Sequence, residues 1–346
     1  YYTQGDVNFE KQDLTAYFEN AAVMKSADYD QDGDLDIFVG NNMVSNDFGA
    51  IPNSYILKNN NGNFSILENQ PFQNSGMITD AIWEDYDSDG IIDLILVGEW
   101  MSPKFFKNIK GNFVEENLIK PKLTGLWQQI TPFDIDKDGD VDYLLGNWGK
   151  NSKFKASKEH PLRMYYSDFD GNGSTETILC NFKDGAYYPL LGLDELASQI
   201  VSLRKKITNY KSFAGKSIDA IFEKSVLKKA LIFEVNTLAS GYLKNDNNIF
   251  TFVPFKNELQ VSPISAFLEF DFDANGENEV LVAGNYFGVS PYHGRFDSFP
   301  GALIFNEENI ILGNKVGLDF SQKAVKKLNS IKVKNKLYLL ATINND

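Results

Sequence analysis

The sequence predicts an all-β fold assembled from repeated sheets, with one helical insertion. Three observations indicate this: an acidic loop recurs five times, each copy continues into a short apolar run, and an aromatic hairpin pattern recurs between copies. Short apolar runs bounded by Gly, Asn and Asp are typical of strands, and repetition along the chain indicates a repeat architecture. The chain has 346 residues, of which 43% are hydrophobic, so it can bury a large core.

Acidic residues outnumber basic ones, 47 to 33, and the formal net charge is -14. Nucleic acid and anionic membrane surfaces would repel this charge, so neither is an expected partner. No apolar run approaches the roughly 18 residues of a membrane span, so we expect no direct span. The single cysteine, Cys180, excludes an internal disulfide framework, and two histidines argue against a His-rich metal site.

The acidic loop begins at Asp28, Asp85, Asp134, Asp168 and Asp271. The copies read DYDQDGDLD, DYDSDGIID, DIDKDGDVD, DFDGNGSTE and DFDANGENE, with oxygen-bearing side chains at positions 1, 3, 5 and 9 and glycine at position 6. One copy would also suit an acidic surface turn, but five in register favour bound cations. A hard cation with about six to eight oxygen ligands fits the pattern, and Ca²⁺ fits better than Mg²⁺.

An EF-hand is the main alternative for such a loop. Its loop ends on a bidentate Glu at position 12, where the first three copies carry Val39, Leu96 and Leu145. It also leads into a helix, whereas these loops lead into strand-like runs such as residues 37–40 and 94–98. The acid at position 9 is therefore expected to close each site.

The pattern DxDxDGxxDLxVG resembles the FG-GAP/VCBS repeat of calcium-binding β-propellers, including integrin α-chain head domains. Residues 191–215 and 284–297 further resemble the large FG-GAP surface proteins of Bacteroidota that are similar to cartilage acidic protein. The resemblance implies up to five Ca²⁺ ions. Their implied ligands, with position 7 offering a backbone carbonyl, are Asp28, Asp30, Asp32, Asp34 and Asp36; Asp85, Asp87, Asp89, Ile91 and Asp93; Asp134, Asp136, Asp138, Asp140 and Asp142; Asp168, Asp170, Asn172, Ser174 and Glu176; Asp271, Asp273, Asn275, Glu277 and Glu279. The last two loops carry Asn at position 5 and Glu at position 9, so we expect weaker binding there.

The loop starts lie 57, 49, 34 and 103 residues apart. The first two spacings suit a four-stranded propeller blade, the third predicts a trimmed blade, and the fourth predicts an unmarked blade plus an insertion. The hairpin pattern recurs at residues 55–64, 105–113 and 242–250. We predict a single β-propeller over residues 1–346, with seven blades and with six or eight as alternatives. Strands at residues 1–9 and 336–342 are expected to share a blade.

Residues 191–227 are predicted to form a helical insertion. Leu196, Ile200, Leu203 and Ile207 recur at helical spacing, and the polar face is basic. This segment is either a docking surface for a partner or an insertion that packs across a propeller face and leaves its lysines in water. The second interpretation is favoured, because amphipathic insertions usually pack their apolar face on the protein and leave their polar face in water.

No catalytic motif stands out: we find no GxSxG, HExxH, P-loop or dinucleotide-binding GxGxxG. A candidate ligand face is predicted from Trp100 and Trp148, which follow equivalent strands, and from His293 and Arg295 in an aromatic loop. The alternatives are that the tryptophans fill space between blades and that Arg295 pairs with Asp297.

The expected function is that of a non-catalytic, calcium-stabilised binding or scaffold module that recognises a protein or a glycan. The resemblance implies a cell-surface location on the outer membrane of a Gram-negative bacterium. There the chain would be part of a lipoprotein or another accessory subunit of a nutrient-uptake or surface complex. A calcium-dependent polysaccharide lyase or hydrolase is the alternative, but the closed ligand sets leave no vacancy for a substrate.

Overall fold

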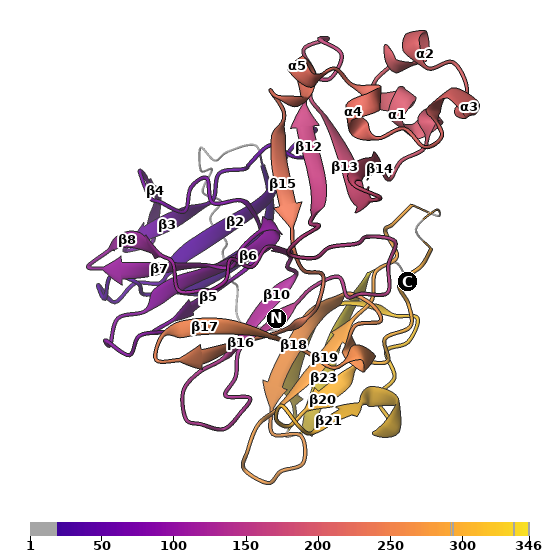
Figure 1. Cartoon of the computed structure of the whole chain (residues 1–346). Coiled ribbons are helices and arrows are strands. Elements are labelled where there is room, and N and C mark those ends of the chain that lie inside the picture. The colour runs from indigo at the N-terminus through magenta and orange to yellow at the C-terminus, as the bar shows by residue number, and fades with distance from the viewer. Residues whose placement is uncertain (1–18, 291, 293, 335, 345–346) are drawn as a thin grey trace.

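The computed structural model describes residues 19–290, 292, 294–334 and 336–344 (Figure 1). The described chain is all-β, and its α-helices are confined to one segment, as predicted. The predicted strand at residues 1–9 lies outside the described residues. No helix in the described ranges has the length and apolar character needed to cross a membrane.

Five sheets follow one another along the chain, and all their strands are antiparallel. Sheet I consists of β1 (Glu19–Ala27), β2 (Asp36–Val44), β3 (Tyr55–Asn60) and β4 (Asn63–Leu67). Sheet II consists of β5 (Met77–Glu84), β6 (Asp93–Met101), β7 (Lys104–Ile109) and β8 (Asn112–Glu116), with β9 (Gly125–Leu126) paired to β6. Sheet III consists of β10 (Gln129–Pro132), β11 (Tyr143–Gly146), β16 (Gly241–Asp246) and β17 (Ile249–Pro254). Sheet IV consists of β18 (Ile264–Phe270), β19 (Glu279–Gly284), β20 (Ala302–Ile304) and β21 (Ile310–Leu312), and sheet V of β22 (Ala324–Val333) and β23 (Lys336–Asn344).

The three predicted hairpins are confirmed. They join β3 to β4, β7 to β8 and β16 to β17, each through a two-residue turn. Both turn residues have positive φ, as at Asn61 (52°) and Gly62 (89°). Asn and Gly tolerate this backbone conformation, which matches the twist of the flanking strands.

A further four-stranded sheet, the inserted sheet, interrupts sheet III between β11 and β16. Its order is β14 (Ala186–Pro189), β13 (Glu176–Lys183), β12 (Leu162–Ser167) and β15 (Leu231–Val235). The fourth acidic loop lies in this sheet, so the prediction of a trimmed blade there is wrong. Sheet III is instead split, and its halves meet where Tyr143 pairs with Leu243.

The predicted helical insertion is a series of short helices between β14 and β15. They are α1 (Leu193–Gln199), α2 (Leu203–Lys206), α3 (Tyr210–Phe213), α4 (Ile218–Ile221) and α5 (Lys224–Leu227). Their apolar side chains, including Leu196, Ile200 and Leu203, share a buried cluster with Phe169 and Ile178. The helices therefore pack on the inserted sheet, above the other five (Figure 1). Basic residues of this segment pair with its own acids, Arg204 with Asp194 and Lys206 with Glu223.

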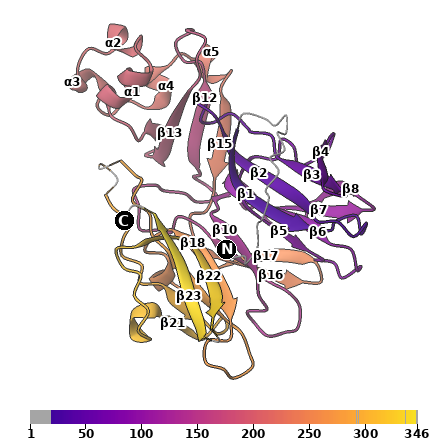
Figure 2. The same ribbon diagram turned by 180° about the vertical axis from the view of Figure 1, so that it is seen from behind.

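The first strands of the five sheets lie side by side: β1 with β5, β5 with β10, β10 with β18, and β18 with β22 (Figure 2). A pocket of about 350 Å³ lies where they meet, lined by residues of all five sheets such as Val23, Asp80 and Lys326. Within the described residues the sheets do not close a ring, and the prediction of seven blades is not confirmed. Among the described residues, β23 pairs with β22 alone.

Candidate metal centres

All five acidic loops join the first strand of a sheet to the second, in sheets I to IV and in the inserted sheet. Every loop therefore leads into a strand, as predicted, and not into an EF-hand helix. Position 6 is a glycine with φ between 87° and 98° in all five copies, and position 4 has φ between 59° and 75°. Glycine adopts this left-handed conformation without strain, which explains its place at the sharpest point of the loop.

The carboxylate at position 1 organises each turn. Asp85 Oδ1 accepts a hydrogen bond from the Asp89 N–H at 3.0 Å, and Asp85 Oδ2 accepts one from the Gly90 N–H at 2.9 Å. The first aspartates of the other loops accept from equivalent N–H groups. In every copy the position-5 side chain also accepts from the position-7 N–H. Hydrogen bonds between the side chains and the backbone N–H groups of each loop therefore hold its conformation.

The acid at position 9 is buried where the second strand begins. Asp36, Asp93 and Asp142 have no exposed surface. One oxygen of each accepts an N–H from the third strand at 2.7 Å, donated by Asn59, Asn108 and Asn245 respectively. In these three loops the bond fixes the acid at position 9, the side chain expected to close the site.

In four loops the acidic side chains converge. One oxygen from each of three residues lies within 4.8 Å of the other two, in the triads Asp28, Asp30 and Asp32; Asp85, Asp87 and Asp93; Asp134, Asp136 and Asp142; and Asp271, Asp273 and Glu279. Such triads could bind a metal ion, and their all-oxygen chemistry is consistent with Ca²⁺. The fourth loop forms no such triad among the described residues.

The electrostatics of these loops fit a cation. Burial raises the pKa of Asp93 to about 7 and that of Asp142 to about 6, and neighbouring loop carboxylates add to both shifts. In the described residues, every buried carboxylate oxygen without a hydrogen-bond partner belongs to a loop: Asp30 Oδ1, Asp36 Oδ2, Asp93 Oδ2, Asp134 Oδ1, Asp140 Oδ1 and Asp170 Oδ1. Buried oxygens without donors are costly, and a bound cation would satisfy them.

Comparison with protein families identifies the repeat. Residues 28–96 and 85–145 match the FG-GAP-like repeat. The chain contains FG-GAP-like repeats. The matched segments include the first three loops and exclude the fourth and fifth, which are the two that carry Asn at position 5 and Glu at position 9. No curated protein matches the chain.

Three lysines beside the loops of the matched repeats were not predicted as site residues. Lys58, Lys107 and Lys244 lie on the third strands of sheets I, II and III. Each pairs with the position-3 aspartate of its own sheet, namely Asp30, Asp87 and Asp136. The signal was in the recurring Lys-Asn pair of the hairpin pattern, which was interpreted only as strand and turn.

The candidate ligand face is largely filled. Trp100 is only 7% exposed and shares an apolar cluster with Trp148 and with residues of the inserted sheet, such as Leu162 and Met164. The Trp148 ring contacts the Phe296 ring at a centroid distance of 5.6 Å. Arg295 is the residue that precedes Phe296 in the sequence. Arg295 pairs with Asp297 at 3.5 Å, and His293 lies outside the described residues.

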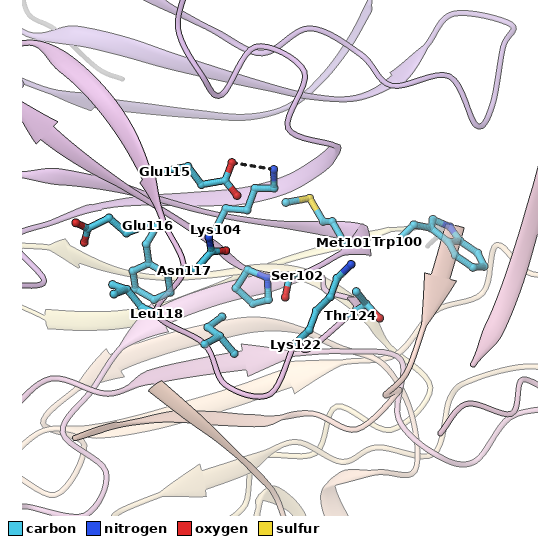
Figure 3. Close-up of a pocket in the computed structure, with 13 residues that line it drawn as sticks. Trp100, Met101, Ser102, Lys104, Glu115, Glu116, Asn117, Leu118, Lys122 and Thr124 are labelled. Atoms are coloured by element: carbon cyan, nitrogen blue, oxygen red, sulfur yellow. Dashed lines mark hydrogen bonds and ion pairs between the residues drawn. The ribbon is translucent and has the colours of Figure 1, made fainter. Parts of the chain in front are cut away.

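A groove adjoins Trp100 at the boundary between sheet II and the inserted sheet. It consists of two cavities, of about 500 and 310 Å³, that share Trp100, Lys122 and Thr124. Figure 3 shows Lys122 extending toward the middle of the larger cavity. The backbone at Trp100 has φ 61°, an uncommon value for a bulky residue and one often found at functional sites.

Proposed function

We propose that the chain is a calcium-stabilised, non-catalytic binding module of the β-propeller type. The observation that carries this proposal is the repetition of one carboxylate loop at the same place in four successive sheets, each with three converging oxygens. The triad residues would hold the ions. A bound Ca²⁺ would offset two negative charges in each loop. The backbone N–H groups of Asn59, Asn108 and Asn245 hold the position-9 acids of the first three loops in place.

We place the ligand in the groove beside Trp100, and infer that it is an acidic glycan. The acids that line the groove are already engaged: Glu115 with Lys104, Glu116 with the Tyr86 hydroxyl, and Glu234 with Arg163. Lys122 and Lys158, by contrast, form no ion pair with another described residue. The groove therefore offers two ammonium groups without an ion pair, against one carboxylate, Glu116, that is hydrogen-bonded but not ion-paired. Sugar carboxylates would pair with these two ammonium groups.

The proposed setting is the surface of a Gram-negative bacterium, within an accessory subunit of a nutrient-uptake or other surface complex. The resemblance to Bacteroidota FG-GAP proteins supports this setting. Extracellular calcium is also abundant enough for modules that bind it with affinities of roughly 10⁻⁴–10⁻³ M.

The test is titration calorimetry with acidic oligosaccharides in the presence of Ca²⁺. We expect wild type to bind, the double variant Lys122→Ala/Lys158→Ala to bind at least about tenfold more weakly, and Lys332→Ala, at an exposed lysine on β22, to match wild type. Recovery of a protein partner without glycan binding would contradict the glycan assignment. Release of unsaturated oligosaccharides would identify a lyase and contradict the non-catalytic assignment.

A further inference from the structure

Three metal loops carry a lysine in the same register. The residue after position 9 pairs with the residue before the lysine in each sheet: Ile37 with Leu57, Leu94 with Phe106, and Tyr143 with Leu243. Strand pairing therefore delivers Lys58, Lys107 and Lys244 to the same side of the three loops. Identical placement in three sheets argues against accidental surface contacts.

Each ammonium contacts the acidic side chains that face the cluster. Lys58 contacts Asp30 and lies 3.8 Å from Asp32, while Lys107 contacts Asp87 and lies 3.0 Å from Asp89. Lys244 contacts Asp136 in the third loop. In the first loop the lysine takes Asp30 Oδ2, and Asp30 Oδ1 is left buried without a partner. The lysine thus adds a positive charge beside the converging oxygens without occupying all of them.

The fifth loop provides an internal comparison. In the fifth loop, the residue after the position-9 acid is Val280, which pairs with Ile304. The residue after Ile304 is Phe305, and it occupies the position that the lysine has in the first three sheets. Phe305 packs against an apolar cluster and carries no charge. Among the described residues, no lysine of sheet IV pairs with the triad Asp271, Asp273 and Glu279, and the basic contact of this loop is Lys137 of the third loop, which pairs with Glu277 at position 7.

We propose that Lys58, Lys107 and Lys244 are built-in counter-charges that stabilise the first three loops without a divalent ion and lower their affinity for it. An ammonium group beside three carboxylates reduces their mutual repulsion, and the same charge repels an incoming cation. The fifth loop has Phe305 in this register, and its lysine contact is made at Glu277, outside the triad. This inference rests on the proposed calcium-stabilised function.

The experiment compares Ca²⁺ affinity and thermal stability in the full chain. The variants are the triple Lys58→Gln/Lys107→Gln/Lys244→Gln, the charge-conserving Lys107→Arg, and the control Lys206→Gln. Lys206 pairs with Glu223 at 3.2 Å within the helical segment. Calorimetry gives the Ca²⁺ affinity, and melts are recorded with chelator and with saturating Ca²⁺. For the triple variant we expect about three- to tenfold tighter Ca²⁺ binding, a lower melting temperature in chelator, and a melting temperature near wild type in Ca²⁺. The other two variants should match wild type.

Two results would overturn the inference while the calcium function stands. Unchanged affinity with equal destabilisation in chelator and Ca²⁺ would make the lysines merely structural. Weaker affinity in the triple variant would make them positioning residues for Asp30, Asp87 and Asp136. Absence of Ca²⁺ binding by wild type would instead overturn the proposed function, and this inference with it.

Discussion

Asn108 of sheet II donates its side-chain amide to the Tyr29 carbonyl in the first metal loop, at 2.7 Å. The Asn108 backbone N–H donates to Asp93 in the second metal loop, also at 2.7 Å. Because Asn108 is buried, one residue joins the metal loops of two neighbouring sheets through bonds that water does not replace. Order in one loop is therefore linked to order in the next.

This bridge predicts that Asn108→Ala costs about 2–3 kcal/mol of unfolding free energy, because it leaves buried donors and acceptors unpaired. Denaturant unfolding in Ca²⁺ measures the loss. The control is Asn245→Ala, since Asn245 is buried in the same register of sheet III and, among the described residues, its side chain bonds to Val141 and Asn248 of its own sheet. Equal losses in the two variants would show that the contact between sheets contributes nothing.

Asp93→Asn tests the closing acid at position 9. Asp93 is fully buried, and burial raises its pKa, so a neutral amide is well tolerated when no ion is present. We expect little change of melting temperature in chelator but the loss of one bound Ca²⁺ per chain in calorimetry. Asp184→Asn, in an exposed hairpin, should keep the full number of ions. An unchanged ion count in Asp93→Asn would refute the role of position 9.

Lowering the pH should stabilise the ion-free chain and reduce the additional stabilisation that calcium provides. The pKa values of Asp93 and Asp142 are raised to about 7 and about 6, from 3.8 in the unfolded chain. The folded state therefore binds protons more tightly, so the contribution of these groups to stability is fully present below about pH 4 and is lost as the pH rises through 6 to 7. In chelator, the melting temperature should increase from pH 8 to pH 5.5. In Ca²⁺, protons compete with the ion, so the stabilisation by calcium should shrink over the same interval. A stabilisation by calcium that is equal at both pH values would contradict this prediction.

The inserted sheet and its helices share a core, so Leu196→Ala should destabilise this unit by about 2–5 kcal/mol. Leu196 is fully buried in the cluster that joins α1 to β13. The matched control is Val201→Ala, because Val201 is 69% exposed in the same segment. Hydrogen exchange of β12 and β13 measures the local loss. Unchanged protection in Leu196→Ala would show that the helices do not support the sheet.

Local features of the fold could be predicted from the sequence. The five loops and three hairpins each depend on residues within about a dozen positions, with glycine at position 6 of every loop and glycine or asparagine at five of the six hairpin-turn positions. The sequence pattern predicts that the acid at position 9 closes each site; the structure buries Asp36, Asp93 and Asp142 and places Asp93 and Asp142, but not Asp36, in a converging triad.

Long-range pairing could not be predicted in this way. Nothing local to Tyr143 shows that it pairs with Leu243, so the split of sheet III was missed. The same pairing brings Lys244 to Asp136, a contact between residues far apart in the sequence that no local pattern shows. The burial of Trp100 likewise depends on the inserted sheet, whose position the local pattern does not give.

The central claim is that the carboxylate triads bind calcium and stabilise the fold. The most direct measurement is calorimetric titration of the chelator-treated chain with Ca²⁺, followed by thermal melts with and without the ion. The account predicts up to four ions per chain, one for each triad, and a clearly higher melting temperature in Ca²⁺. No binding heat, together with identical melts in Ca²⁺ and chelator, would contradict it.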